Sequence, residues 1–176
     1  MLLTVLCSVN VMAQKGMNGI GLNCPFAVGQ ETTSIGVGVK YQYNVSNYFR
    51  IEPSVAYMFK LSDRSDGTYD YPVFNAFLNG NIFFSSPQSI RPYLIAGVGY
   101  VNYHYKRFDN NNILSDDNMT DGFDYNVGLG CDFRLNHSLS IQIEAKGMSC
   151  AISETNVHDY QGKWTILANI GLTYNF

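Results

Sequence analysis

Apolar and polar residues alternate through most of the chain from residue 16 onward. The last segment shows this best: one parity carries Trp164, Ile166, Ala168, Ile170, Leu172, Tyr174 and Phe176, and the other carries Thr165, Leu167, Asn169, Gly171, Thr173 and Asn175. Successive side chains of a β-strand point to opposite faces. A period of two therefore predicts strands with one apolar and one polar face.

Seven further segments repeat this amphipathic pattern, so we expect eight antiparallel strands in all. They are residues 16–28, 33–45, 49–61, 72–84, 91–104, 122–135, 139–151 and 164–176. The connections alternate in length. Short turns are expected near 46–47, 86–89 and 136–138, and longer polar loops at 62–71, 105–121 and 152–163, with a shorter one near 29–32. Short periplasmic turns opposite longer external loops are typical of outer-membrane barrels.

Composition favours a membrane setting without favouring helices. Charged residues make up 14% of the chain, below the roughly 25% usual for soluble domains. No apolar run reaches the roughly 18 residues that a spanning helix needs, and the mean hydropathy is −0.07. A closed barrel pairs all of its backbone groups within hydrocarbon. We therefore predict an all-β fold, an eight-stranded antiparallel transmembrane β-barrel.

The first residues predict export. Residues 1–13 resemble a secretory signal peptide, with an apolar core at Met1–Cys7 and small or modest residues at Val11–Ala13 before a cleavage site after Ala13. A basic segment before the apolar core is missing, since Lys15 is the first cation. Residues 14–176 would then form the mature barrel domain.

Three local motifs carry a family resemblance. Arg91-Pro92-Tyr93-Leu94-Ile95-Ala96-Gly97-Val98-Gly99-Tyr100 resembles a strand common in the OmpA/OmpX-like family of small outer-membrane barrels. The ending Leu172-Thr173-Tyr174-Asn175-Phe176 resembles that family's assembly signal, and Ala13-Gln14 resembles a cleavage junction frequent in Bacteroidetes exports. The resemblance implies a cell outer-membrane address, and Tyr174 and Phe176 would be recognised by the barrel-assembly machinery. Because family members differ in activity, function must be argued from the site.

Charged residues of both signs fall on the polar parity of the strands. The interior of an eight-stranded barrel is only wide enough for side chains to fill it. We therefore expect these charges, interleaved with Asn and Gln, to pair and hydrogen-bond across the lumen. The expected network comprises Lys40, Arg50, Glu52, Lys60, Arg91, Asp124, Asp132, Arg134, Glu144 and Lys146. Inward-facing glycines could make room for long side chains, let the strands curve, or leave a narrow water path.

No catalytic or metal centre is expected. The histidines at 104, 137 and 158 lack the His-x-Ser pattern of lipid A deacylase barrels, because Asp159-Tyr160 follows His158. The carboxylates of 106–121 do not match an EF-hand loop, so a solvated loop is the preferred interpretation. We therefore expect no enzyme activity and no cofactor.

The preferred function is that of an integral outer-membrane barrel with a structural, surface-interaction or envelope-integrity role. Its expected partners are membrane lipid, lipopolysaccharide, the assembly machinery and an unidentified ligand at the external loops, but no nucleic acid. One alternative is a narrow porin-like channel for ions or small solutes. A lesser alternative is a soluble secreted β-sandwich or lipocalin-like carrier, in which Ile141, Ile143, Ile166 and Ile170 would face inward.

Overall fold

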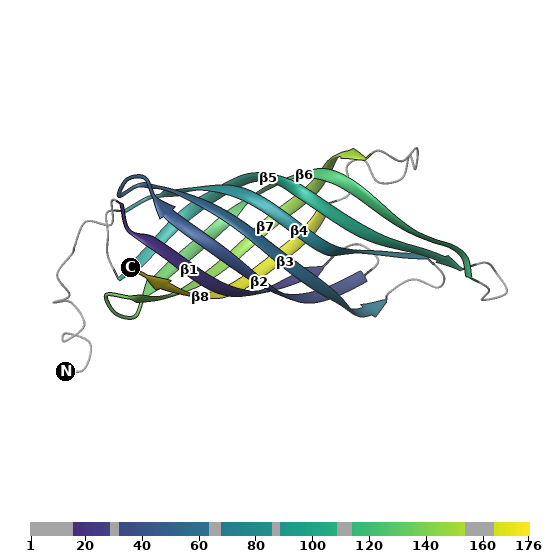
Figure 1. Cartoon of the computed structure of the whole chain (residues 1–176), viewed down its shortest axis with the longest axis horizontal. Helices are drawn as coiled ribbons and strands as arrows, with labels where there is room; N and C mark the ends of the chain where they lie inside the picture. The colour runs from purple at the N-terminus through teal and green to yellow at the C-terminus, as the bar shows by residue number, and fades with distance from the viewer. Residues whose placement is uncertain (1–15, 29–31, 64–67, 86–88, 109–113, 154–163) are drawn as a thin grey trace.

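The computed structural model is a closed barrel of eight antiparallel strands, each hydrogen-bonded to its neighbours in chain order (Figure 1). It describes residues 16–28, 32–63, 68–85, 89–108, 114–153 and 164–176. The strands are β1 (Asn18–Val28), β2 (Thr32–Asn44), β3 (Phe49–Asp63), β4 (Thr68–Phe83), β5 (Ile90–Phe108), β6 (Leu114–Arg134), β7 (Leu139–Ser153) and β8 (Trp164–Asn175). No helix among these residues is long and apolar enough to cross a membrane.

The barrel closes where β1 pairs with β8. Ten consecutive residues of β1, Gly19–Val28, are in register with Ile166–Asn175 of β8. Closure leaves no free edge along this seam, so the backbone groups of both strands are paired with each other. The prediction of an all-β, eight-stranded antiparallel barrel is confirmed.

The two ends of the barrel differ. One end, here called the turn end, carries the connections β2–β3, β4–β5 and β6–β7 together with the C-terminus (Figure 1). Two of these turns are held by side-chain caps: Ser46 Oγ accepts from the backbone N–H of Phe49 at 3.0 Å, and Asn136 Oδ1 accepts from that of Leu139 at 2.8 Å. By the rule for bacterial barrels, this is the periplasmic end. The opposite end is called the loop end.

The polar segment 105–121 is mostly strand, not the loop that its composition predicts. β5 continues to Phe108 and β6 begins at Leu114, so the two strands form a long hairpin at the loop end (Figure 1). Its register places Lys106 opposite Asp117 and Arg107 opposite Asp116. A strand outside the membrane needs no apolar face.

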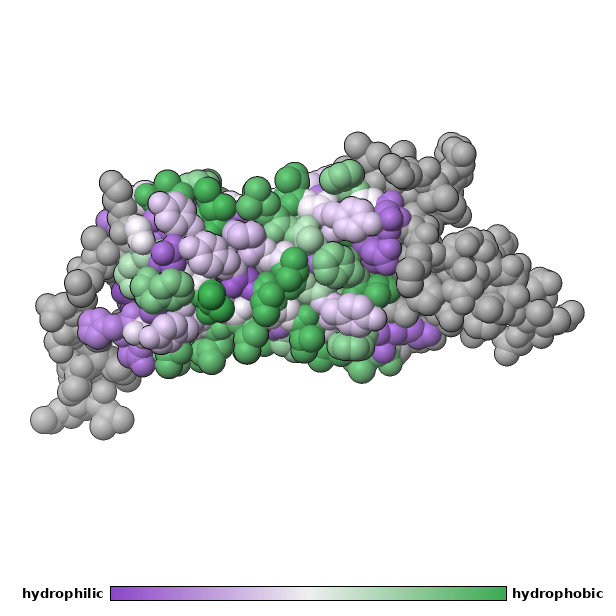
Figure 2. Space-filling view, viewed as in Figure 1, coloured by the Kyte–Doolittle hydropathy of each residue, from purple (hydrophilic) through white to green (hydrophobic). Residues whose placement is uncertain are grey.

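Along the barrel wall, the outward-facing residues whose side chains are described are mostly apolar, as the alternation predicts. Ile20, Leu22, Val37, Leu78 and Ile170 are each more than half exposed, and Figure 2 shows apolar side chains along the visible wall. The inward parity carries the buried polar residues. This arrangement is the reverse of a soluble sandwich or carrier, where Ile143, Ile166 and Ile170 would be buried.

Candidate functional site: the barrel interior

Glu144 is the centre of a hydrogen-bonded group that reaches across the lumen. Its Oε1 accepts hydrogen bonds from Lys40 Nζ at 3.2 Å and from Tyr93 Oη at 2.9 Å. Its Oε2 accepts one from Asn169 Nδ2 at 2.9 Å and lies 3.2 Å from Lys146 Nζ. These partners come from β2, β5, β8 and β7, so one buried carboxylate joins four strands.

Glu52 extends this group toward β3 and β4. Its Oε2 lies 3.6 Å from Lys40 Nζ and accepts hydrogen bonds from Gln42 Nε2 at 2.7 Å and Asn81 Nδ2 at 3.5 Å. Gln42 also donates to Gln142 Oε1 on the opposite wall at 2.9 Å. We call the charged residues Lys40, Glu52, Glu144 and Lys146 the hub cluster; it contains two cations and two anions.

A second group of charges lies nearer the turn end. Arg50 Nη1 donates to Asp132 Oδ2 at 3.3 Å and to Gln42 Oε1 at 2.9 Å, which links this group to the hub cluster. Arg91 is in register with Asp132 on the neighbouring strand, and Arg134 follows two residues after Asp132 on the same face. We call Arg50, Arg91, Asp132 and Arg134 the arginine cluster.

Aromatic rings pack against the arginine cluster. The guanidinium carbon of Arg91 lies 3.8 Å from the centroid of the Phe83 ring, and that of Arg50 lies 4.7 Å from the same centroid and 5.2 Å from that of Tyr93. Desolvated cation–π contacts of this kind stabilise by about 2 kcal/mol. Arg91 Nη2 also donates to the backbone oxygen of Asn47 at 2.7 Å, which ties β5 to the β2–β3 turn.

The remaining two charges of the predicted network lie elsewhere. Asp124 is buried and Lys60 is half-buried, and both lie nearer the loop end. Each interacts with another residue. The structure thus brings eight of the ten predicted residues into two linked clusters and places Lys60 and Asp124 outside both.

Apolar side chains also fill the interior, which the polar parity does not predict. Phe77, Val101 and Met148 form one buried cluster in the loop half of the barrel. A second consists of Ala27, Met58 and Leu167, and a third, at the turn end, of Phe83, Tyr93 and Ile95. The interior therefore contains both polar and apolar clusters.

Two inward glycines are required by the close approach of a ring. A Cβ on Gly130 would lie about 2.5 Å from Cε2 and Cζ of Tyr93, and one on Gly99 would lie 2.5 Å from Cδ1 of Phe77. Real Cβ atoms do not approach this closely. Of the three roles expected for such glycines, these two positions fit the first, making room for a long side chain.

The ten residues predicted by number are all charged, and they leave out the individual neutral members of the network. Gln42, Tyr93 and Asn169 each bond directly to a charged residue of the hub cluster. Their parity was a usable signal, since Tyr93 is two residues from Arg91 and points the same way. The alternation does not show which charged residue each of these side chains bonds to, because the bonded residues lie on strands that are distant in sequence.

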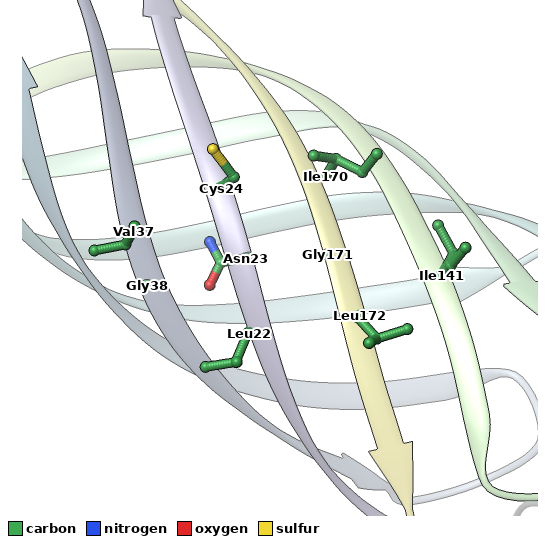
Figure 3. Close-up of a pocket in the computed structure, with 9 residues that line it drawn as sticks. All are labelled: Leu22, Asn23, Cys24, Val37, Gly38, Ile141, Ile170, Gly171 and Leu172. Carbon is green, nitrogen blue, oxygen red and sulfur yellow. The ribbon is translucent and has the colours of Figure 1, made fainter.

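The outer wall carries a shallow apolar depression at the β1–β8 seam. Figure 3 shows Leu22, Val37, Ile141, Ile170 and Leu172 around it. Gly38 and Gly171 contribute backbone to its floor, and Cys24 lies at its edge. The lining is almost wholly apolar, which fits a lipid hydrocarbon chain against the wall.

Aromatic residues project from the wall near both ends. Tyr125 and Trp164 meet edge to face near the loop end, with ring centroids 5.8 Å apart. Tyr174 and Phe176 stack near the turn end, 6.4 Å apart, and both are more than half exposed. Two such girdles mark the membrane–water interfaces of barrel proteins.

Comparison with solved structures finds the same fold in outer-membrane proteins. The Neisserial surface protein A is 10% identical, with a TM-score of 0.64 over 91% of this chain and 96% of that protein. The N-terminal barrel of OprF from Pseudomonas aeruginosa is 13% identical, with a TM-score of 0.62 over 94% and 100%. OprG from the same organism is 15% identical, with a TM-score of 0.58 over 92% and 96%.

No curated protein matches the sequence. The family described as "Outer membrane protein beta-barrel domain" matches residues 1–176, the whole of the chain. The family match, the barrel fold and the apolar outer wall all indicate a location in the cell outer membrane. The chain belongs to the outer membrane protein beta-barrel domain family and is an eight-stranded outer-membrane β-barrel.

Proposed function

We propose that this protein is a closed, filled outer-membrane anchor with a structural or surface-interaction role, and that it does not conduct solutes. The observation that carries the proposal is the position of Glu144, whose carboxylate bonds to Lys40 and Tyr93 on two strands that are not neighbours of β7. It also bonds to Asn169 on the adjacent β8 and lies 3.2 Å from Lys146 on its own strand. A solute moving along the barrel axis would have to break these buried ion pairs. Leaving one buried partner uncompensated costs roughly 3–5 kcal/mol.

The apolar clusters support the same proposal. Phe77, Val101 and Met148 meet in the loop half of the barrel and are each at most 6% exposed. Apolar side chains in a constriction disfavour water, and polar solutes need water to pass.

The long β5–β6 hairpin supports the surface-interaction role. It carries the sheet past the wall at the loop end, which is the external end by the rule for bacterial barrels. A rigid anchor beneath a projecting hairpin is an arrangement suited to presenting a binding surface outside the cell. The outer wall itself meets membrane lipid and, in the outer leaflet, lipopolysaccharide.

Export and assembly complete the proposal. Residues 1–13, which lie outside the described residues, act as the signal peptide. Tyr174 and Phe176 act as the assembly signal that the barrel-assembly machinery recognises; their exposure on β8 at the periplasmic end supports this role.

The test is conductance of refolded residues 14–176 in a planar lipid bilayer, with insertion verified by heat-modifiable gel mobility. Inserted protein is expected to be electrically silent. A variant carrying Lys40→Ala and Glu144→Ala, which removes the central cross-lumen contact, is expected to show small conductance steps. Reproducible ohmic steps from the unmodified protein would overturn the filled-anchor proposal in favour of a narrow channel.

A further inference from the structure

The charges of the two clusters do not balance. The hub cluster is neutral, but the arginine cluster has three cations and one anion, Asp132. Arg50 and Arg91 are 2% and 1% exposed, so this excess of positive charge is held largely inside the barrel. Burying charge without a counterion is costly, and so the imbalance calls for a compensating anion.

Among the described residues, no side-chain carboxylate other than Asp132 belongs to the arginine cluster. The segments that adjoin the turn end in sequence and lie outside the described residues, 1–15 and 86–88, contain no Asp or Glu. Glu52 and Glu144 are already shared with Lys40 and Lys146. The remaining buried carboxylate of the described part of the chain, Asp124, lies toward the loop end.

The arginine cluster also has unused hydrogen-bond donors. Among the described residues, Arg50 Nε and Nη2, Arg91 Nε and Nη1, and Arg134 Nη2 have no hydrogen-bond acceptor although these atoms are buried. Arg50 and Arg91 both lie over the Phe83 ring, and all three arginines interact electrostatically with Asp132. These five donors therefore belong to one small region, and among the described atoms of the arginine cluster the buried acceptor without a hydrogen bond is a single Asp132 oxygen, Oδ1.

We propose that the arginine cluster is a binding site for a small inorganic anion at the periplasmic end of the lumen. Guanidinium N–H groups of Arg50 and Arg91, with Arg134 at the mouth, would donate to the anion. The N–H groups of a guanidinium can donate to a halide ion or to the oxygens of phosphate. The guanidinium also keeps its positive charge at any physiological pH. The wall separates this region from lipid headgroups, so the anion comes from the periplasmic solution.

The experiment is thermal unfolding of the refolded barrel in detergent, followed by circular dichroism at constant ionic strength. Sodium gluconate, whose anion is too large for a packed interior, is replaced stepwise by chloride, bromide or phosphate. A ligand bound only by the folded state raises the unfolding midpoint in a saturable way, by roughly 5 °C at a hundredfold excess over Kd. If the unfolding midpoint rises saturably with chloride and bromide but not with phosphate, the site binds monatomic ions only. If it also rises saturably with phosphate, the site binds an oxyanion as well.

The matched variants are Arg91→Met with Arg134→Met, and Lys60→Met as a control. The double variant removes two cations from the arginine cluster and is expected to lose the saturable shift. The control removes a cation outside the cluster and is expected to keep it. Equal, non-saturating shifts in all three proteins would show general salt effects and overturn the proposal.

A second measurement does not depend on the variants folding. Crystals of the unmodified protein grown with bromide are expected to show an anomalous peak within hydrogen-bond distance of Arg50 or Arg91. Ordered water there, with no anomalous peak, would mean that solvation alone stabilises the arginines, and the site would be withdrawn.

Discussion

At the scale of single residues, the interior depends on a few groups with several partners each. Glu144 accepts hydrogen bonds from Lys40, Tyr93 and Asn169 and pairs with Lys146. A buried ion pair adds little over an apolar replacement, but removing one partner leaves an uncompensated charge. Stability is therefore most sensitive at the residue with the most partners.

Replacing Glu144 by Gln is expected to lower the free energy of unfolding by roughly 3–5 kcal/mol, because Lys40 and Lys146 lose their shared carboxylate. Urea unfolding in detergent can be followed through Trp164, the single tryptophan. The control is Asp121→Asn, at an exposed carboxylate near the loop end, where a change below about 0.5 kcal/mol is expected. Adding Lys146→Met to Glu144→Gln should recover part of the loss, since one unpaired cation is removed. Equal stability of the Glu144 and Asp121 variants would contradict the central role of Glu144.

Replacing Gly130 by Ala is expected to destabilise the barrel by roughly 1–3 kcal/mol through overpacking, because the new Cβ displaces the Tyr93 ring. Gly80→Ala is the matched control, since its nearest neighbour is a Phe49 ring atom at 3.3 Å. The two variants are compared by the same urea titration. If both behave alike, Tyr93 has room to move and the interior is looser than its contacts indicate.

At the scale of elements, the sequence predicts the strands within the membrane well and those outside it poorly. The expected segment 33–45 and β2, Thr32–Asn44, differ by one residue at each end. β6 begins at Leu114, whereas the alternation predicts a start near 122. The reason is physical: the lipid and the lumen impose opposite polarity on the two faces of a strand, and neither acts on the projecting hairpin.

The projecting hairpin is expected to be dispensable for folding. Replacing residues 104–119 by Asn-Gly joins Tyr103 to Thr120, which face each other in register, through a two-residue turn suited to that dipeptide. What remains of β5 and β6 still exceeds the roughly 9–11 residues that span a bilayer. The variant should keep its heat-modifiable gel shift while losing any surface binding that the intact protein shows. Failure to refold would instead make the hairpin part of the folding core.

The assembly role of Phe176 can be separated from stability. Phe176→Ala is expected to lower the amount assembled in the outer membrane severalfold while leaving refolding of the purified protein unchanged, because the side chain is 57% exposed on the wall. Tyr48→Ala, at another exposed aromatic near the turn end, serves as control. Membrane fractionation with heat-modifiable mobility measures both. Normal assembly of the Phe176 variant would contradict the proposed role of Phe176 in the assembly signal.

At the scale of the whole molecule, the fold and the inward position of the charged residues were predictable, but the pairing within the lumen was not. Alternation alone places Arg50, Asp132 and Glu144 on the inner face. It does not show that Arg50 meets Asp132 while Lys40 and Lys146 share Glu144. Those contacts depend on strand tilt and on register around a closed sheet. Phe77 and Met148 were also beyond prediction, because apolar residues on the polar parity look like breaks in the pattern.

Closure of β1 against β8 has a consequence for how the cell handles the protein. Because the seam pairs the first strand with the last, no portion of the barrel can be sealed before β8 is available. A chain that stops short of β8 leaves β1 and β7 with open edges, which hydrocarbon cannot solvate. Stable insertion therefore requires that the chain be translated through its final strand. Shorter fragments cannot close the barrel and stay exposed to periplasmic proteases.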